Sequence, residues 1–400
     1  MLFAAGNRVT GMKKFLFAVA AVAAVMVLAV FLFPPPSAHR APASPAAVPD
    51  ESSAGEPLEP PDAGHEDQRS AAGFSRALTR VLAELRDGTA GAATDARRAE
   101  LFHEMKRAAL AAEPSSAADA IVAALDAGDD AGTGLGFVVG AGGAMTETPT
   151  YRTALLDVLG QVDPRAAALH ARRLLRDPSV SPDEYAIALR NLAHGPREEF
   201  TVAEIRTAFA AMVARQDWRA DPTTGFLEAF DAAVEASAFA EIAPLLVDPG
   251  EAAETPLVRA AFIAADRIML SDPGAVVSAL AADPRILSSA PFHRASLLSR
   301  LDVRDPSQQA LLKEYLLRFE HAPDELDYFF DVFPNGNAFV GYSLVTRGAV
   351  GGPDEAAVSR FDEVTVGTLR NWLSLPEFSA RSEGLGGVIR RLTGSGPTDP

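Results

Sequence analysis

Helix start and stop signals recur along most of the chain, and they constrain the fold more than any other feature. Ser181-Pro182-Asp183-Glu184 combines a capping box with proline at the first helical position. Apolar residues follow at positions 185, 188, 189 and 192, which is the spacing of one helix face. Gly195-Pro196 ends this pattern, and Thr201 and Glu204 form the next capping box. The sequence therefore predicts short, capped, amphipathic helices.

Asp-Pro pairs recur between the apolar stretches and suit helix starts, because aspartate accepts hydrogen bonds from free N–H groups and proline needs none. Their spacing shows no constant period, so it does not establish strict repeats. The pairs are Asp163-Pro164, Asp177-Pro178, Asp221-Pro222, Asp248-Pro249, Asp272-Pro273, Asp283-Pro284 and Asp305-Pro306.

Strand signals are almost missing, so we predict an all-α fold of stacked helix pairs over residues 72–393, with a break near 132–146. Helix pairs such as 151–176 and 181–216 resemble the HEAT and armadillo class of α-solenoids. This resemblance is one of architecture, because no diagnostic family motif is present. A compact, irregular helical bundle fits the pattern nearly as well.

The N-terminal region holds an uncharged run of 19 apolar residues, Phe15 to Phe33, which would span about 28 Å as a helix. Its length favours an uncleaved transmembrane anchor over a cleaved signal peptide. Arg8, Lys13 and Lys14 precede the run, so the positive-inside rule predicts residues 1–14 as a short cytoplasmic tail. We expect a single-pass protein of a bacterial inner membrane, with its main domain periplasmic.

Residues 34–71 contain nine prolines between Pro34 and Pro61, among Ala, Ser, Glu and Asp. This composition predicts a disordered linker, and residues 394–400 are predicted to be a disordered tail. The net charge of −17 disfavours nucleic acid as a partner. The chain has no cysteine, which excludes disulfides, thiolate metal sites and a cysteine nucleophile.

Motifs for catalysis, cofactors and metals are weak or absent. Gly134-Leu135-Gly136 follows a predicted helix instead of a strand, so it does not predict a dinucleotide loop. Asp126, Asp129 and Asp130 lack the acidic twelfth position of a calcium loop, which falls at Phe137. No two histidines have zinc-protease spacing, and we interpret each as solvated or capping. We expect no cofactor, no metal and no catalytic residue.

An aromatic segment at 328–342 is the most distinctive candidate for recognition. Leu326, Phe329, Phe330 and Phe333 have helical spacing and are interpreted as core. The remaining side chains flank an Asn-Gly turn and are predicted to form a rim where a partner docks. These candidate partner-binding residues are Tyr328, Phe339, Tyr342, Asp327 and Asp331.

Function is inferred here from predicted architecture, since solenoids commonly bind protein or peptide on an extended face. We expect a membrane-tethered scaffold that binds a protein or peptide partner of the cell envelope without catalysis, while Phe15 to Phe33 contacts the lipid bilayer. The alternative is an envelope hydrolase of cell-wall glycan or peptide, which would require a deep cleft holding two acids with raised pKa values. A third hypothesis is a purely structural spacer.

Overall fold

The computed structural model describes residues 71–87, 92–250, 255–318, 321–322, 324–336, 343–346 and 355–394. All of them belong to the second of the two units into which the chain divides, Pro61–Pro400. The predicted tail 1–14, the predicted anchor Phe15 to Phe33 and nearly all of the predicted linker lie outside the described residues. Within the described ranges, no helix combines the length and the apolar character needed to cross a membrane.

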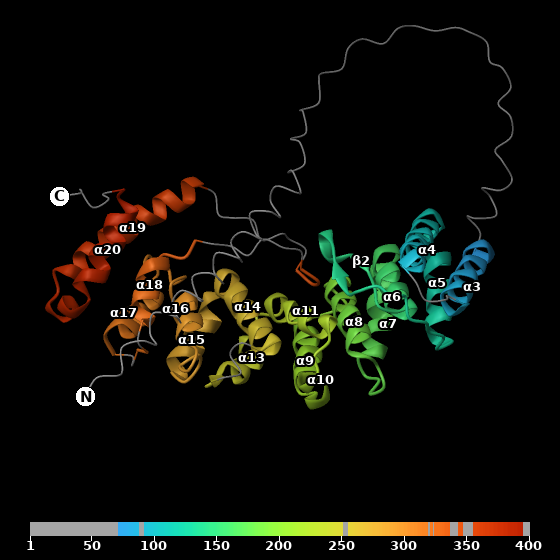
Figure 1. Ribbon diagram of the computed structural model, residues 1–400, viewed down its shortest axis with the longest axis horizontal. Helices are drawn as coiled ribbons and strands as arrows, with labels where there is room; N and C mark the ends of the chain where they lie inside the picture. Colours follow the sequence, from blue (N-terminus) through green and yellow to red (C-terminus); the bar gives the residue numbers. More distant parts are fainter. Residues whose placement is uncertain are drawn as a thin grey trace, which may run out of the picture. The chain divides into compact units, whose positions relative to one another are not determined.

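The described residues are predominantly helical, which confirms the all-α prediction at this level (Figure 1). The first half of the domain contains α3 (Ala71–Asp87), α4 (Ala92–Ala111), α5 (Pro114–Asp126), α6 (Tyr151–Val162), α7 (Pro164–Leu174), α8 (Pro182–His194), α9 (Val202–Val213), α10 (Gln216–Ala220), α11 (Thr224–Glu228) and α12 (Asp231–Glu235). The second half contains α13 (Phe239–Leu246), α14 (Pro256–Ser271), α15 (Pro273–Ala282), α16 (Pro291–Leu298), α17 (Pro306–Arg318), α18 (Glu325–Val332), α19 (Glu355–Leu373), the 3₁₀ helix η3 (Pro376–Arg381) and α20 (Ser382–Leu392).

The helix boundaries at α8 and α9 confirm the predicted capping boxes. The Ser181 hydroxyl accepts from the Glu184 N–H, and the Glu184 carboxylate accepts in return from the Ser181 N–H. Thr201 and Glu204 make the same exchange at the start of α9. Each exchange satisfies donors that the first turn of a helix leaves free.

The Asp-Pro pairs divide into two groups, so the prediction that they start helices is only partly right. Pro164, Pro273 and Pro306 do begin helices, and Asp163 and Asp305 cap theirs by accepting backbone N–H groups. The other four pairs lie in turns or bends between helices. At Asp177 and Asp283, for example, the carboxylate accepts from the N–H two residues later, which closes a local turn.

The helices from α6 onward form pairs, and the first helix of each pair packs on the first helix of the next. α6 contacts α8, and α8 contacts α12. Further along the chain, α12 contacts α14, α14 contacts α16, and α16 contacts α18. Buried ion pairs join several of these neighbours at similar sequence separations. Asp157 pairs with Arg190 33 residues later, Asp266 with Arg300 34 residues later and Asp231 with Arg267 36 residues later. These ion pairs therefore link neighbouring helices at separations of 33, 34 and 36 residues.

The glycine-rich stretch at 132–143, where the sequence predicts a break in the helical pattern, contains no α-helix. Val138–Val139 (β1) and Met145–Glu147 (β2) form an antiparallel hairpin around a single 3₁₀ turn, Ala141–Gly143. Gly142 and Gly143 have φ values of +66° and +78°, a conformation that side chains disfavour. The glycines therefore allow a tight hairpin in a chain whose other described elements are helical.

Candidate peptide-binding site

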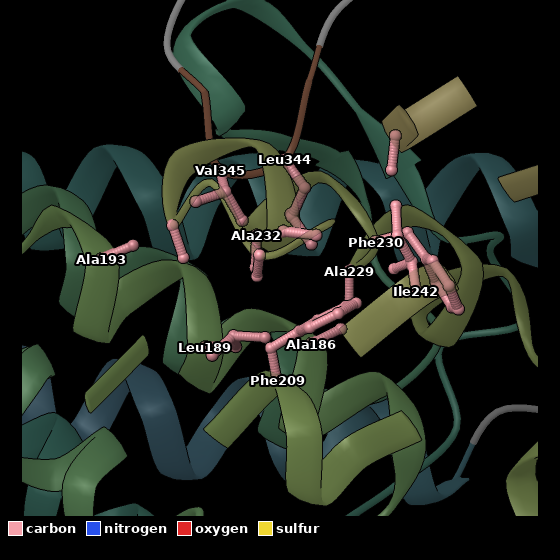
Figure 2. Packing of buried hydrophobic residues seen from close by; sticks show 14 of the residues in the cluster. Ala186, Leu189, Ala193, Phe209, Ala229, Phe230, Ala232, Ile242, Leu344 and Val345 are labelled. Carbon is pink, nitrogen blue, oxygen red and sulfur yellow. The ribbon is translucent and has the colours of Figure 1, made fainter. Parts of the chain in front are cut away.

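A short segment from the C-terminal part of the chain, Ser343–Thr346, lies across helices that precede it by more than 100 residues. Leu344 and Val345 are buried in the main hydrophobic core. Figure 2 shows their side chains directed at Ala232 of α12, within a cluster that includes Leu189 of α8. The segment thus occupies an apolar groove on α8 and α12, and we call it the strap.

Asp231, the first residue of α12, holds the main chain of the strap. One carboxylate oxygen accepts from the N–H groups of Val345 at 2.8 Å and of Thr346 at 2.6 Å. The other oxygen accepts from the Thr346 hydroxyl at 2.9 Å and from Arg267 Nη1 of α14 at 3.0 Å. Asp231 is only 5% exposed, and charged hydrogen bonds of this kind are stronger than neutral ones.

His194, in the last turn of α8, holds the strap from the other side. Its Nε2 lies 2.7 Å from the carbonyl oxygen of Val345. A carbonyl can only accept, so Nε2 carries the proton and donates. Val345 is therefore held through both its N–H and its carbonyl.

The hairpin closes a third side of the groove and is fixed by a buried charge network. Arg190 of α8 donates from Nη1 to the Gly143 carbonyl at 2.7 Å and to Asp157 at 2.6 Å. Asp157 also accepts from the Met145 N–H at 3.0 Å. A Cβ atom on Gly143 would collide with the Leu344 carbonyl, so this glycine permits the close approach of hairpin and strap.

The contacts to the strap are of two kinds, and together they define what the groove recognises. Asp231 and His194 bind main-chain atoms, which every residue type presents. The apolar core receives Leu344 and Val345, and Asp231 receives the hydroxyl of Thr346. The arrangement suits a short segment with two apolar residues followed by serine or threonine. Both carboxylate oxygens of Asp231 are already engaged by donors.

Three of the five predicted partner-binding residues, Tyr328, Asp327 and Asp331, belong to the described part of the chain. Tyr328 of α18 packs edge-to-face on Phe292 at a centroid distance of 5.4 Å. Asp327 and Asp331 line a cavity of about 490 Å³ between α18 and α20, together with Arg390 and other residues. Phe339 and Tyr342 lie outside the described residues. The structure therefore brings Asp327 and Asp331 to one cavity, while Tyr328 contacts a different helix.

Sequence reasoning did not find the residues that bind the strap. His194 was interpreted as a solvated or capping residue, and it instead donates to a carbonyl 151 residues away. Asp231 carries no local motif, because it lies in a helix of only five residues. The only sequence signal for the strap is an apolar pair, Leu344-Val345, in a stretch without helical periodicity.

The acidic cluster before the hairpin has its carboxylates engaged by donors. Asp129 pairs with Arg86 at 2.6 Å, and Asp130 accepts from the Arg152 N–H at 3.0 Å. Asp126 faces His170 and Arg173 across a cleft of about 460 Å³. In the part of the chain that the structure describes, no group of three or more His, Asp or Glu residues is arranged to hold a metal ion.

His170 in this cleft predicts a pH-dependent stability. Burial, and then the Arg173 guanidinium, lower the pKa of its imidazole. Its stabilising contribution is therefore complete above the unfolded pKa of about 6.5 and is lost as the pH falls through the folded-state pKa. Between pH 7.5 and 5.5 we expect the native chain to lose about 1 kcal/mol more unfolding free energy than His170→Gln. Denaturant unfolding at both pH values measures this difference.

His103→Gln is the matched control for this prediction, because His103 is exposed on α4. That variant should keep the pH dependence of the native chain. An equal loss of stability for the native chain and His170→Gln would show that His170 does not couple protonation to folding.

Comparison with known proteins found no match: no family model fits the chain, and no curated protein or solved structure is significantly similar to it.

Proposed function

We propose that this protein is a peptide-binding scaffold of helical repeats, which binds a short segment of a protein partner in the groove on α8 and α12. In this proposal Phe15 to Phe33 anchors the chain in a bacterial inner membrane, and the helical domain acts in the periplasm without catalysis. One observation carries the binding role: the strap already lies in the groove as a bound peptide would, held through its main chain by Asp231 and His194.

The burial of the strap supports a partner with the same pattern of side chains. Leu344 and Val345 contribute apolar contacts, and burying one such side chain typically contributes about 1.5–3 kcal/mol. The main-chain contacts add affinity without selecting a sequence. A partner segment with two apolar residues followed by Ser or Thr would satisfy the same groups. The strap then acts as the internal occupant that such a partner replaces.

The hydrolase alternative finds less support at this site. Glu228 of α11 lines a cavity beside Asp231, and burial and Asp231 raise the pKa of its carboxyl. A hydrolase of the expected kind needs a second acid that is free to accept or release a proton. Asp231, the neighbouring acid, is instead engaged by the strap and by Arg267. We therefore favour binding.

The proposal predicts that weakening the strap opens the groove to a peptide in solution. The probe is a fluorescein-labelled peptide with the sequence of residues 341–348, GYSLVTRG. In the double variant Leu344→Ser with Val345→Ser, the strap loses its apolar contacts and occupies the groove more weakly. The labelled peptide should then displace the strap more easily. Fluorescence anisotropy should show at least tenfold tighter binding to this variant than to the native chain.

Two controls make this test decisive. A scrambled peptide, GYVTSRLG, keeps the composition and should not bind. Adding Asp231→Asn to the variant weakens the clamp on the peptide main chain and should reduce affinity at least tenfold, while Asp217→Asn, a change at an exposed aspartate, should not. If the double variant retains its helical circular dichroism and fails to bind the probe at millimolar concentration, the proposal is wrong.

A further inference from the structure

A cavity of about 290 Å³ lies between α11, α12 and α14, beside the Asp231 carboxylate. Leu227, Pro256 and Ile263 supply apolar walls, and Glu228, Arg259 and Arg267 supply charged groups. Pockets for small ligands combine apolar walls with a few polar groups in this way. This cavity is distinct from the groove that holds the strap, although Asp231 contributes to both.

Glu228 brings a carboxylate without a cation. It is half-buried, and no hydrogen bond or ion pair to it occurs among the described residues. Burial, followed by the nearby charge of Asp231, raises the pKa of its carboxyl, and Arg267 opposes this only partly. A half-buried carboxylate without a partner is costly, and a cationic group bound beside it would offset that cost.

Arg267 brings a donor without an acceptor. Its Nη1 donates to Asp231 at 3.0 Å, while its Nε–H is buried and meets no acceptor in the described structure. Arg259, about two helical turns earlier on α14, is exposed and makes no ion pair with any described residue. A buried N–H without an acceptor typically costs about 1–3 kcal/mol. The Arg267 side chain lines the cavity and is 14% exposed, so an anionic group there would pair with the accessible part of its guanidinium.

We propose that this cavity binds a free apolar amino acid, with its ammonium group on Glu228 and its carboxylate on the Arg267 guanidinium and Arg259. The zwitterion supplies both missing partners at once, and the apolar side chain contacts Leu227 and Ile263. A plain carboxylic acid would leave Glu228 without a cation, and an amine would leave Arg267 without an acceptor. This inference does not depend on peptide binding in the neighbouring groove.

The experiment is isothermal titration of the full chain with three matched probes. L-leucine carries both charged groups, 4-methylpentanoate lacks the ammonium group, and 3-methylbutylamine lacks the carboxylate. We expect saturable binding of L-leucine and at least tenfold weaker binding of each single-charge probe. Glu228→Gln and Arg259→Ala should each weaken L-leucine binding at least tenfold.

Glu198→Gln and Arg219→Ala are the matched controls, because they make the same chemical changes at exposed residues outside the cavity. Both should bind L-leucine as the native chain does. The proposal is overturned if the native chain shows no saturable binding of L-leucine at 10 mM. It is also overturned if 4-methylpentanoate binds as tightly as L-leucine, or if Glu228→Gln leaves the affinity unchanged. None of these outcomes depends on whether GYSLVTRG binds.

Discussion

Glu325→Ala should lower the free energy of unfolding by about 3–5 kcal/mol, because it leaves a buried guanidinium without its counter-ion. Glu325 opens α18 and is fully buried. Its carboxylate accepts from Arg294 Nε at 2.8 Å and Nη2 at 2.7 Å, a two-point contact of high geometric quality. It also accepts from the Tyr315 hydroxyl at 2.9 Å and the Ala322 N–H at 3.1 Å. Urea unfolding followed by circular dichroism measures the loss.

Asp327→Ala provides the comparison on the same helix. Asp327 lies two residues later and is exposed, so we expect a change within about 0.5 kcal/mol. A second variant, Glu325→Leu with Arg294→Met, removes both charges and should recover part of the loss. An effect of Glu325→Ala as small as that of Asp327→Ala would mean that the buried pair contributes little to stability.

Asp157→Ala should be similarly costly, with a loss of about 3–5 kcal/mol, since it removes the acceptor shared by α8 and the hairpin. Asp157 is fully buried, and it accepts from Arg190 at 2.6 Å, the Met145 N–H at 3.0 Å and Gln161 Nε2 at 2.7 Å. The hairpin depends on this residue directly. Hydrogen exchange should therefore show lost protection at the Met145 amide, alongside the drop in global stability from urea unfolding.

Asp217→Ala tests whether burial is the reason for the large loss of stability expected of Asp157→Ala. Asp217 also pairs with an arginine, Arg215, at 2.8 Å, and it is 61% exposed at its side chain. Exposed pairs contribute about 0–1 kcal/mol, so this variant should remain close to the native chain. Equal losses for Asp157→Ala and Asp217→Ala would contradict our account of the network.

The helices were predictable because their signals are local. The capping boxes at Ser181 and Thr201 lie within four residues of the helices that they start, and the structure confirms both. The core interpretation of Phe329 and Phe333 is also confirmed, since both are buried. The Asp-Pro pairs were less reliable predictors of helix starts. The same pair is compatible with a helix start and with a turn, and the neighbouring residues decide which one forms.

The candidate site was not predictable, because the residues that form it are far apart in the sequence. Asp231 and Val345 are 114 residues apart, and nothing near either residue marks the other. The hairpin was missed because its strands have two and three residues, too few to show alternation. The buried ion pairs between helices were not predictable either, because their partners lie more than 30 residues apart and carry no local signal.

The strap also has a consequence for how the chain reaches its folded state during synthesis. Most contacts in stacked helix pairs join neighbours in sequence, so such arrays fold early and piece by piece. The hydrogen bonds from Asp231 and His194 reach 114 and 151 residues ahead. Until those later residues leave the ribosome, α8 and α12 present an uncovered apolar surface. The middle of the domain is thus the stretch of a growing chain most exposed to chaperones and to aggregation.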